Sequence, residues 1–171
     1  MGRFAHLVDT PASMEGFRAL YNISWGVSLQ YCLLGEWHTL RKDGEVIIPI
    51  IVFVEGWIRL PMGRVTRDYL IAHRIFLHQC TPNLFRVLGS IDALNEHMKL
   101  GLTRYNVFWM YEFHLLPDSS YYLKSRSSKV RLISCLPKSN KGMKDDFLIV
   151  LGEWNDGLHY PTQERAPGGV P

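Results

Sequence analysis

The sequence has few cysteines and no long hydrophobic run, and each absence excludes a class of protein. Its 171 residues include three cysteines, Cys32, Cys80 and Cys135, which are far apart and odd in number. Such usage fits reduced thiols inside a cell better than the disulfide framework of a secreted protein. The most apolar run, 46–54, contains Pro49 and is much shorter than the roughly 20 residues that span a bilayer. We therefore expect an intracellular protein, nuclear or cytoplasmic, with no membrane partner.

Complete motifs for catalysis, for metal binding and for phosphate cradling by a glycine-rich loop are also missing. The nearest match to an aspartic-protease motif, 9–11, has proline where the turn requires glycine. His73, His78 and Cys80 lack a fourth zinc ligand, so we interpret them as packing and capping residues near a helix end. The aspartates at 145–146 follow a polar loop, whereas those of a reverse transcriptase follow an apolar strand. We expect no enzymatic activity, no metal and no cofactor.

What the sequence does contain is enough apolar surface for one globular domain. Hydrophobic residues make up 47% of the chain and aromatic residues 12%, which argues against disorder. We expect a loose N-terminus over 1–12 and a single domain over 13–156. The remaining residues, 157–171, are rich in proline and glycine and predict a linker or a truncated tail.

Apolar residues spaced by three and four predict helices in the first two thirds of the chain. A helix over 14–21 would begin after Ser13 as its N-cap. The segment 27–34 is compatible with a strand or a helix. Pro49 can occupy the first turn of a helix through residue 55 or lie on an edge strand, and we favour the helix. A further helix is expected over 63–73.

The longest predicted helix follows Thr81, which is a suitable N-cap before a proline at the first helical position. Its apolar stripe ends near Gly101, and Thr103 can open the next helix. The two helices would pack as an antiparallel hairpin. The segment 105–114 is apolar nearly all round, which predicts a buried helix. Its aromatic residues around Trp109 alternatively provide a self-association face.

Beyond residue 117 the apolar pattern becomes alternating and predicts strands. The expected strands cover 121–126, 129–136 and 147–151. The predicted fold class is therefore α+β, with a helix-rich front half and a small antiparallel sheet or hairpin on the C-terminal side.

Between residues 124 and 144 every charged side chain is positive, although the whole chain has a net charge of only +3. The block consists of Lys124, Arg126, Lys129, Arg131, Lys138, Lys141 and Lys144. A local basic surface of this kind is the best physical indication of a partner.

If residues 127–128 form a hairpin turn, the first four of these residues lie opposite one another in two pairs. Arg126 would then lie opposite Lys129, and Lys124 opposite Arg131. Directly opposed like charges destabilise a sheet unless an anion shares their face. One interpretation is a surface that contacts the phosphates of nucleic acid.

The alternative interpretation is a solvent-exposed face that acids of the same chain neutralise. Suitable acids follow in the sequence: Asp145, Asp146 and Glu153.

Four spaced motifs, in this order, resemble the plant gypsy-type transposon domain. They are 56–62 (GWIRLPM), 79–86 (QCTPNLFR), 121–123 (YYL) and 136–144 (LPKSNKGMK). The resemblance covers roughly residues 44–154 and is more specific than any single motif. It implies the gag-proximal region of a plant LTR-retrotransposon polyprotein, a family without an established activity.

The expected function is a non-enzymatic structural or interaction domain of a retrotransposon-derived protein. Nucleic acid, bound weakly and without sequence preference, is one expected partner, and a second copy or other element-encoded proteins are the others. A catalytic component of transposition is an alternative, although the acids offer no spacing that selects a metal-binding triad. A host-domesticated regulator is another.

Overall fold

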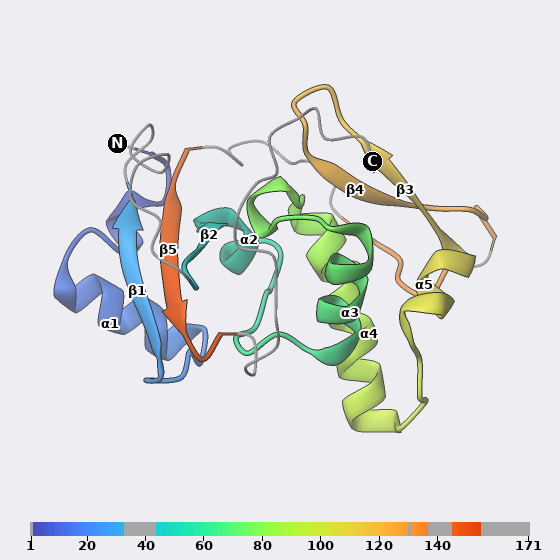
Figure 1. Cartoon of the computed structure of the whole chain (residues 1–171), viewed down its shortest axis with the longest axis horizontal. Coiled ribbons are helices and arrows are strands. Elements are labelled where there is room, and N and C mark those ends of the chain that lie inside the picture. The colour runs from blue at the N-terminus through green and yellow to red at the C-terminus, as the bar shows by residue number, and fades with distance from the viewer. Residues whose placement is uncertain (1, 33–43, 130, 137–144, 155–171) are drawn as a thin grey trace.

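The computed structural model of the chain describes residues 2–32, 44–129, 131–136 and 145–154. These residues form an α+β fold, which confirms the predicted fold class (Figure 1). The helices are α1 (Pro11–Leu20), α2 (Ile50–Val54), α3 (Arg64–His73), α4 (Pro82–Met98) and α5 (Arg104–Met110), with 3-10 turns η1 (Ala5–Leu7) and η2 (Leu77–Gln79). The strands are β1 (Val27–Cys32), β2 (Val46–Pro49), β3 (Tyr111–Leu115), β4 (Tyr121–Ser125) and β5 (Phe147–Gly152).

A three-stranded antiparallel sheet has the order β1-β5-β2. Its central strand, β5, is the predicted apolar strand near the C-terminal end of the domain, and residues 147–150 are buried. The segment 27–34, compatible with strand or helix by pattern, supplies β1 over its described residues, and β2 precedes α2. The sheet therefore combines a late strand with two strands from the front half of the chain.

The N-terminal segment packs into the core, so the expectation of a loose N-terminus is wrong for the described residues of 1–12. Phe4, Ala5 and Val8 are buried. The apolar side chains are covered by the rest of the fold, which offsets the entropy lost on ordering the segment. Helix α1 begins earlier than predicted, since Thr10 is its N-cap and accepts a hydrogen bond from the Ser13 amide at 3.1 Å.

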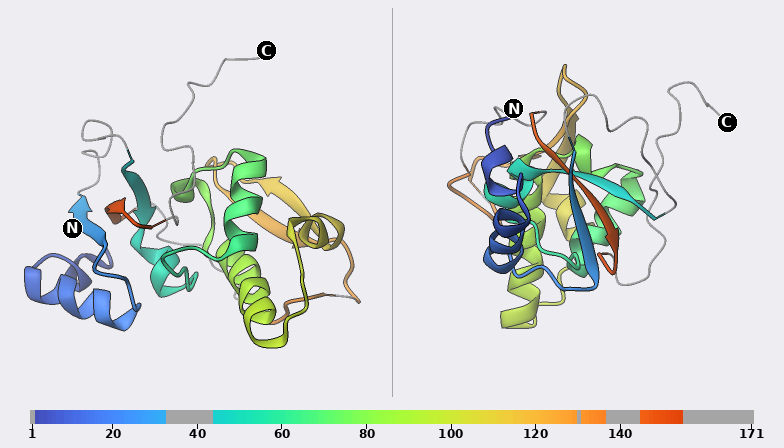
Figure 2. Two further views of the ribbon diagram at one scale, coloured as in Figure 1. Left: turned by 60° about the horizontal axis from the view of Figure 1, so that its bottom comes forward. Right: turned by 90° about the vertical axis from the view of Figure 1, so that its left-hand side faces the viewer.

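Helices α3 and α4 lie together between the sheet and the β3–β4 hairpin (Figures 1 and 2). Thr81 caps α4 as predicted, because its hydroxyl accepts from the Leu84 amide. Helix α4 ends in the left-handed conformation at Lys99, two residues before Gly101. Its main helical partner is α3, so the expected hairpin with the following helix does not form. No helix of the described residues is both long and apolar enough to cross a membrane.

The prediction of a buried helix over 105–114 is wrong. Helix α5 opens after Thr103, as predicted, but ends at Met110, and strand β3 begins at the next residue, Tyr111. Val107 is buried, whereas Trp109 is 83% exposed. Beyond Met110 the chain pairs as a strand instead. Successive side chains therefore point to opposite faces of the sheet, with a period of two residues rather than the 3.6 of a helix.

Candidate nucleic-acid interface

Strand β4, which carries the first residues of the basic block, pairs with β3 and not with the segment 129–136. The described residues of that segment form no strand. Lys124 therefore lies opposite Glu112 rather than opposite another cation. The predicted like-charge pairs are wrong because β3 offers β4 an acid and apolar partners, whereas the expected hairpin would oppose charges of one sign.

The β3–β4 hairpin has one face packed on the core. Phe113 lies opposite Leu123, which is buried, and the rings of Phe113 and Tyr121 stack with centroids 4.6 Å apart. The Phe113 ring also stacks on His73 of α3, at 4.5 Å. These aromatic contacts fix the hairpin on the helices.

We call the other side of the hairpin its outer face, formed by Glu112, His114, Tyr122 and Lys124. His114 stacks on Tyr122 at 5.3 Å and lies 3.0 Å from a Glu112 carboxylate oxygen through Nε2. The hydrogen bond to His114 holds the pKa of Glu112 below its usual value, and the charges of Arg126 and Lys124 act in the same direction. Glu112 thus interacts with three basic groups: His114, Lys124 and Arg126.

The residues Phe108, Trp109 and Arg126 form what we call the Trp109 corner, where α5 meets the end of the hairpin. They line a shallow surface hollow of about 320 Å³. The Arg126 guanidinium donates to the Phe108 carbonyl at 3.1 Å and to Glu112 at 3.3 Å. A cation is therefore held in place beside an indole that is 83% exposed.

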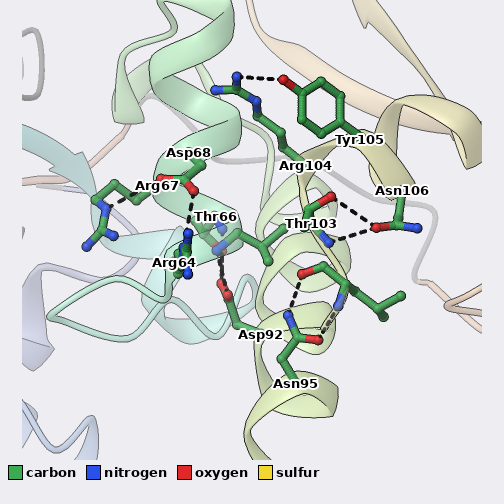
Figure 3. A network of polar contacts seen from close by, with 12 residues as sticks. Arg64, Thr66, Arg67, Asp68, Asp92, Asn95, Thr103, Arg104, Tyr105 and Asn106 are labelled. Atoms are coloured by element: carbon green, nitrogen blue, oxygen red, sulfur yellow. Dashed lines mark hydrogen bonds and ion pairs between the residues drawn. The ribbon is translucent and has the colours of Figure 1, made fainter. Parts of the chain in front are cut away.

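The start of α5, and with it the Trp109 corner, is positioned by polar contacts with α4 (Figure 3). The Asn95 side chain donates to the Leu102 carbonyl and accepts from the Leu102 amide, both at 2.7 Å. The Asn106 side chain accepts from the Thr103 amide at 2.8 Å, which closes the first turn of α5.

A third member of the network, Asp92 of α4, fixes the neighbouring helix. Its carboxylate accepts hydrogen bonds from the Val65 and Thr66 amides at 2.7 and 3.0 Å, which caps α3 (Figure 3). Helices α3, α4 and α5 are thus joined into one rigid support for the hairpin.

The remaining residues of the basic block are not all gathered at this site. Lys129 and Arg131 are exposed and follow the hairpin. The predicted site residues Lys138, Lys141 and Lys144 lie outside the described residues. Of the described members, only Lys124 and Arg126 are brought together, on either side of Glu112.

Of the three acids that were candidates to neutralise the basic block, Asp145 and Glu153 are exposed and Asp146 has another role. Asp146 is buried and accepts hydrogen bonds from the Phe4 amide at 2.7 Å and from the Tyr31 hydroxyl at 2.8 Å. Burial, together with this hydrogen bond, raises the pKa of Tyr31 to about 12.

The described residues contain no cluster of three His, Cys, Asp or Glu side chains that could hold a metal ion. His73 instead packs among aromatic rings, and Cys80 is fully buried. Burial raises the pKa of the Cys80 thiol, which keeps it protonated and unsuited to metal binding.

The favoured prediction of a buried helix missed the exposure of Trp109, for which only the alternative of a self-association face allowed. The available signal was the very density of apolar residues in 105–114, because a seven-residue helix cannot bury all of its faces against one partner.

Comparisons of the chain with protein-family models, curated proteins and solved structures find no match. Any function proposed for this chain therefore rests on the geometry of the hairpin and of the Trp109 corner.

Proposed function

We propose that this chain is a non-enzymatic interaction domain that associates with single-stranded nucleic acid, weakly and without sequence preference. The observation that carries the proposal is the exposed Trp109 indole, which lines the same hollow as the hydrogen-bonded guanidinium of Arg126. The four-motif resemblance adds the proposal that the domain derives from a plant retrotransposon polyprotein.

The two groups suit the two parts of a nucleotide. An exposed aromatic face stacks on any base, which contributes roughly 1 to 3 kcal/mol per base without reading sequence. Arg126 and Lys124, which both lie near Glu112, would supply the cations for the phosphates. Trp109 stacking requires an unpaired base, so a single strand fits the corner better than a duplex.

The charge of the region also supports a phosphate partner. Between residues 105 and 136 the sequence has two acids, Glu112 and Asp118, and four Lys or Arg side chains. Glu112 is shared between Arg126 and His114, so it neutralises the region only in part. Exposed ion pairs contribute little to stability, so Arg126 can exchange Glu112 for a phosphate at small cost.

A second candidate function is self-association through the Trp109 corner. The same exposed indole favours it, because a large exposed aromatic side chain is typical of an interaction surface. This candidate predicts a change of oligomeric state, whereas the first predicts a change of affinity for oligonucleotides.

The test is fluorescence anisotropy with labelled oligo-dT and oligo-U, for the wild-type chain and for Trp109→Ala. Loss of one stacked base, about 1 to 3 kcal/mol, predicts an affinity roughly 5- to 150-fold lower. Trp25→Ala is the matched control, because Trp25 is 77% exposed and also lies beside a guanidinium, that of Arg18 at 5.1 Å. Trp25 precedes β1, on the sheet side of the molecule, and lacks the further cations that Lys124, Lys129 and Arg131 provide after β3, so we expect unchanged affinity.

Salt dependence tests the cationic half of the site. Affinity should fall with salt with a log-log slope of about 0.7 per phosphate contact. Replacing Lys124, Arg126, Lys129 and Arg131 together by Gln should flatten that slope and change the free energy of unfolding by no more than about 1 kcal/mol.

Two outcomes contradict the nucleic-acid proposal. One is equal affinity of the wild-type, Trp109→Ala and four-Gln chains for both oligonucleotides. The other is a chain that binds neither oligonucleotide at low salt. If Trp109→Ala instead converts a dimer into a monomer in sedimentation experiments, the second candidate function is the correct one.

A further inference from the structure

A cavity of about 260 Å³ lies between α4 and the connection from α2 to α3, away from the Trp109 corner. The connection contributes Trp57, Ile58 and Met62, and α4 contributes Phe85, Arg86 and Gly89. Ile58, Met62 and Phe85 are buried side chains, so much of the wall is apolar. A small, largely apolar cavity with a buried charged group in its wall is the usual form of a small-molecule site.

The buried charged group of the wall is Arg86, which is only 6% exposed. Its Nη1 donates to the Asn83 side chain at 3.1 Å, and its guanidinium lies 4.9 Å from the Trp57 ring centroid. Its Nε is buried and has no hydrogen-bond partner. Within the described part of the chain no acid forms an ion pair with Arg86, which is unusual because buried charges are normally paired.

The position of the Asn83 contact leaves one edge of the guanidinium without a hydrogen-bond partner. One N–H of Nη1 donates to Asn83, and the edge formed by Nε and Nη2 makes no hydrogen bond within the described residues. This pair of nitrogens presents two parallel N–H groups, which match the two oxygens of a carboxylate. We propose that the Arg86 cavity binds a small organic monocarboxylate, with the carboxylate on the unpartnered Nε–Nη2 edge of Arg86 and an apolar body against Ile58, Met62 and Phe85.

The charge of the wall favours a monoanion over a phosphate dianion. Arg59 and Arg86 are its cations, and Asp92 and Glu96 are its acids. Asp92 is engaged in capping α3, so its charge is shared with the helix N-terminus. A second negative charge on the ligand would have only Arg59, an exposed side chain whose charge is balanced by that of Glu96. The small volume limits the body to a few carbon atoms or a single ring.

Two residues of the wall provide a readout and a means of blocking the cavity. Trp57 is 63% exposed and covers the guanidinium, so a ligand that reaches Nε must change the surroundings of the indole. Gly89 lies in the middle of α4, and a Cβ atom added there meets no atom within 4 Å. Gly89→Leu would therefore fill the cavity from the helix without a steric conflict at the backbone.

The test is titration of the full chain with sodium benzoate, followed by calorimetry and by the NMR resonance of the Arg86 Nε–H group. Benzamide is the neutral analogue and phenyl phosphate the dianionic one. For a ligand of this size we expect a dissociation constant of about a millimolar. Benzamide should bind at least about tenfold more weakly, because it lacks the charge-assisted hydrogen bonds.

Two variants localise the binding. Arg86→Met and Gly89→Leu should each weaken benzoate binding at least about tenfold. Gly16→Leu is the control, since Gly16 is also a helical glycine with no atom within 4 Å of an added Cβ, and it lies in α1. Gly89→Leu keeps Arg86 in place, so it tests the cavity even if Arg86→Met does not fold.

The proposal is wrong if benzoate and benzamide bind equally, or if phenyl phosphate binds more tightly than benzoate. It is also wrong if benzoate shows no saturable binding at tens of millimolar, or if Gly89→Leu binds it as well as the wild type does. A benzoate titration that leaves the Arg86 Nε–H resonance unmoved would equally exclude the assigned contact.

Discussion

At the scale of single residues, His73 shows how the aromatic core constrains a titratable group. Its ring lies 4.4 Å from Tyr69, 4.9 Å from Phe108 and 4.5 Å from Phe113, measured between centroids. Its Nε2 is buried without a hydrogen-bond partner. Burial lowers the pKa of His73, because the charged ring loses its water and gains no acid in exchange.

We therefore expect acid to destabilise the fold through His73. The pKa of His73 in the folded chain is below its usual value of 6.5, so the unfolded chain binds the proton first as the pH falls. The free energy of unfolding should decrease below about pH 6.5, and this decrease should end once the folded chain is also protonated. Urea denaturation of the wild type and of His73→Phe between pH 4.5 and 8 measures the effect. The two chains should differ in pH dependence, and identical slopes would contradict the assignment to His73.

At the scale of elements, α4 organises the fold because it contacts both halves of the molecule. Leu88 and Ile91 have no exposed surface, and Asp92 on the same helix caps α3. Toward its C-terminal end the helix projects into solvent, where Met98 is 62% exposed. The apolar stripe of the sequence thus covers both a buried and an exposed part of the same helix.

Leu88→Ala should lower the free energy of unfolding by about 2 to 5 kcal/mol, because it leaves a cavity in the core. Met98→Ala is the matched control from the same helix and should change it by no more than about 0.5 kcal/mol. Denaturant midpoints with unchanged slopes measure both values. Similar midpoints for the two variants would mean that the buried part of α4 does not carry the stability expected of it.

At the scale of the whole molecule, one apolar cluster extends from Phe4 near the N-terminus to Trp154 after β5. The sheet and α1 lie on one side of α3 and α4, and the hairpin lies on the other (Figure 1). Asp146 closes this arrangement, since it joins the Phe4 amide to the start of β5 and to Tyr31 of β1. A single carboxylate therefore links segments that are more than a hundred residues apart.

Asp146→Ala should lower the free energy of unfolding by about 1 to 3 kcal/mol, because the buried Phe4 amide loses its acceptor. Asp145→Ala, at the exposed neighbouring position, should change it by no more than about 0.5 kcal/mol. Amide hydrogen exchange at Phe4 should accelerate in the first variant alone. Equal effects of the two substitutions would show that Asp146 does not tie the N-terminal segment to the sheet.

The sequence by itself determined those features that depend on neighbouring residues. The start of α4 follows from Thr81 and the proline after it, since capping acts within one turn. The opening of α5 after Thr103 and the apolar strand β5 follow from equally local patterns. Local signals of this kind also led to the α+β fold class.

Only the tertiary structure decided which segments meet. The alternating pattern of β4 allows pairing with either neighbour in sequence, and the choice of β3 over 129–136 depends on charges and apolar contacts between separate segments. That choice places Glu112 between Lys124 and Arg126 and leaves Trp109 exposed. The burial of Phe4 and the unpaired Nε of Arg86 are equally non-local, because each depends on what the rest of the chain places around it.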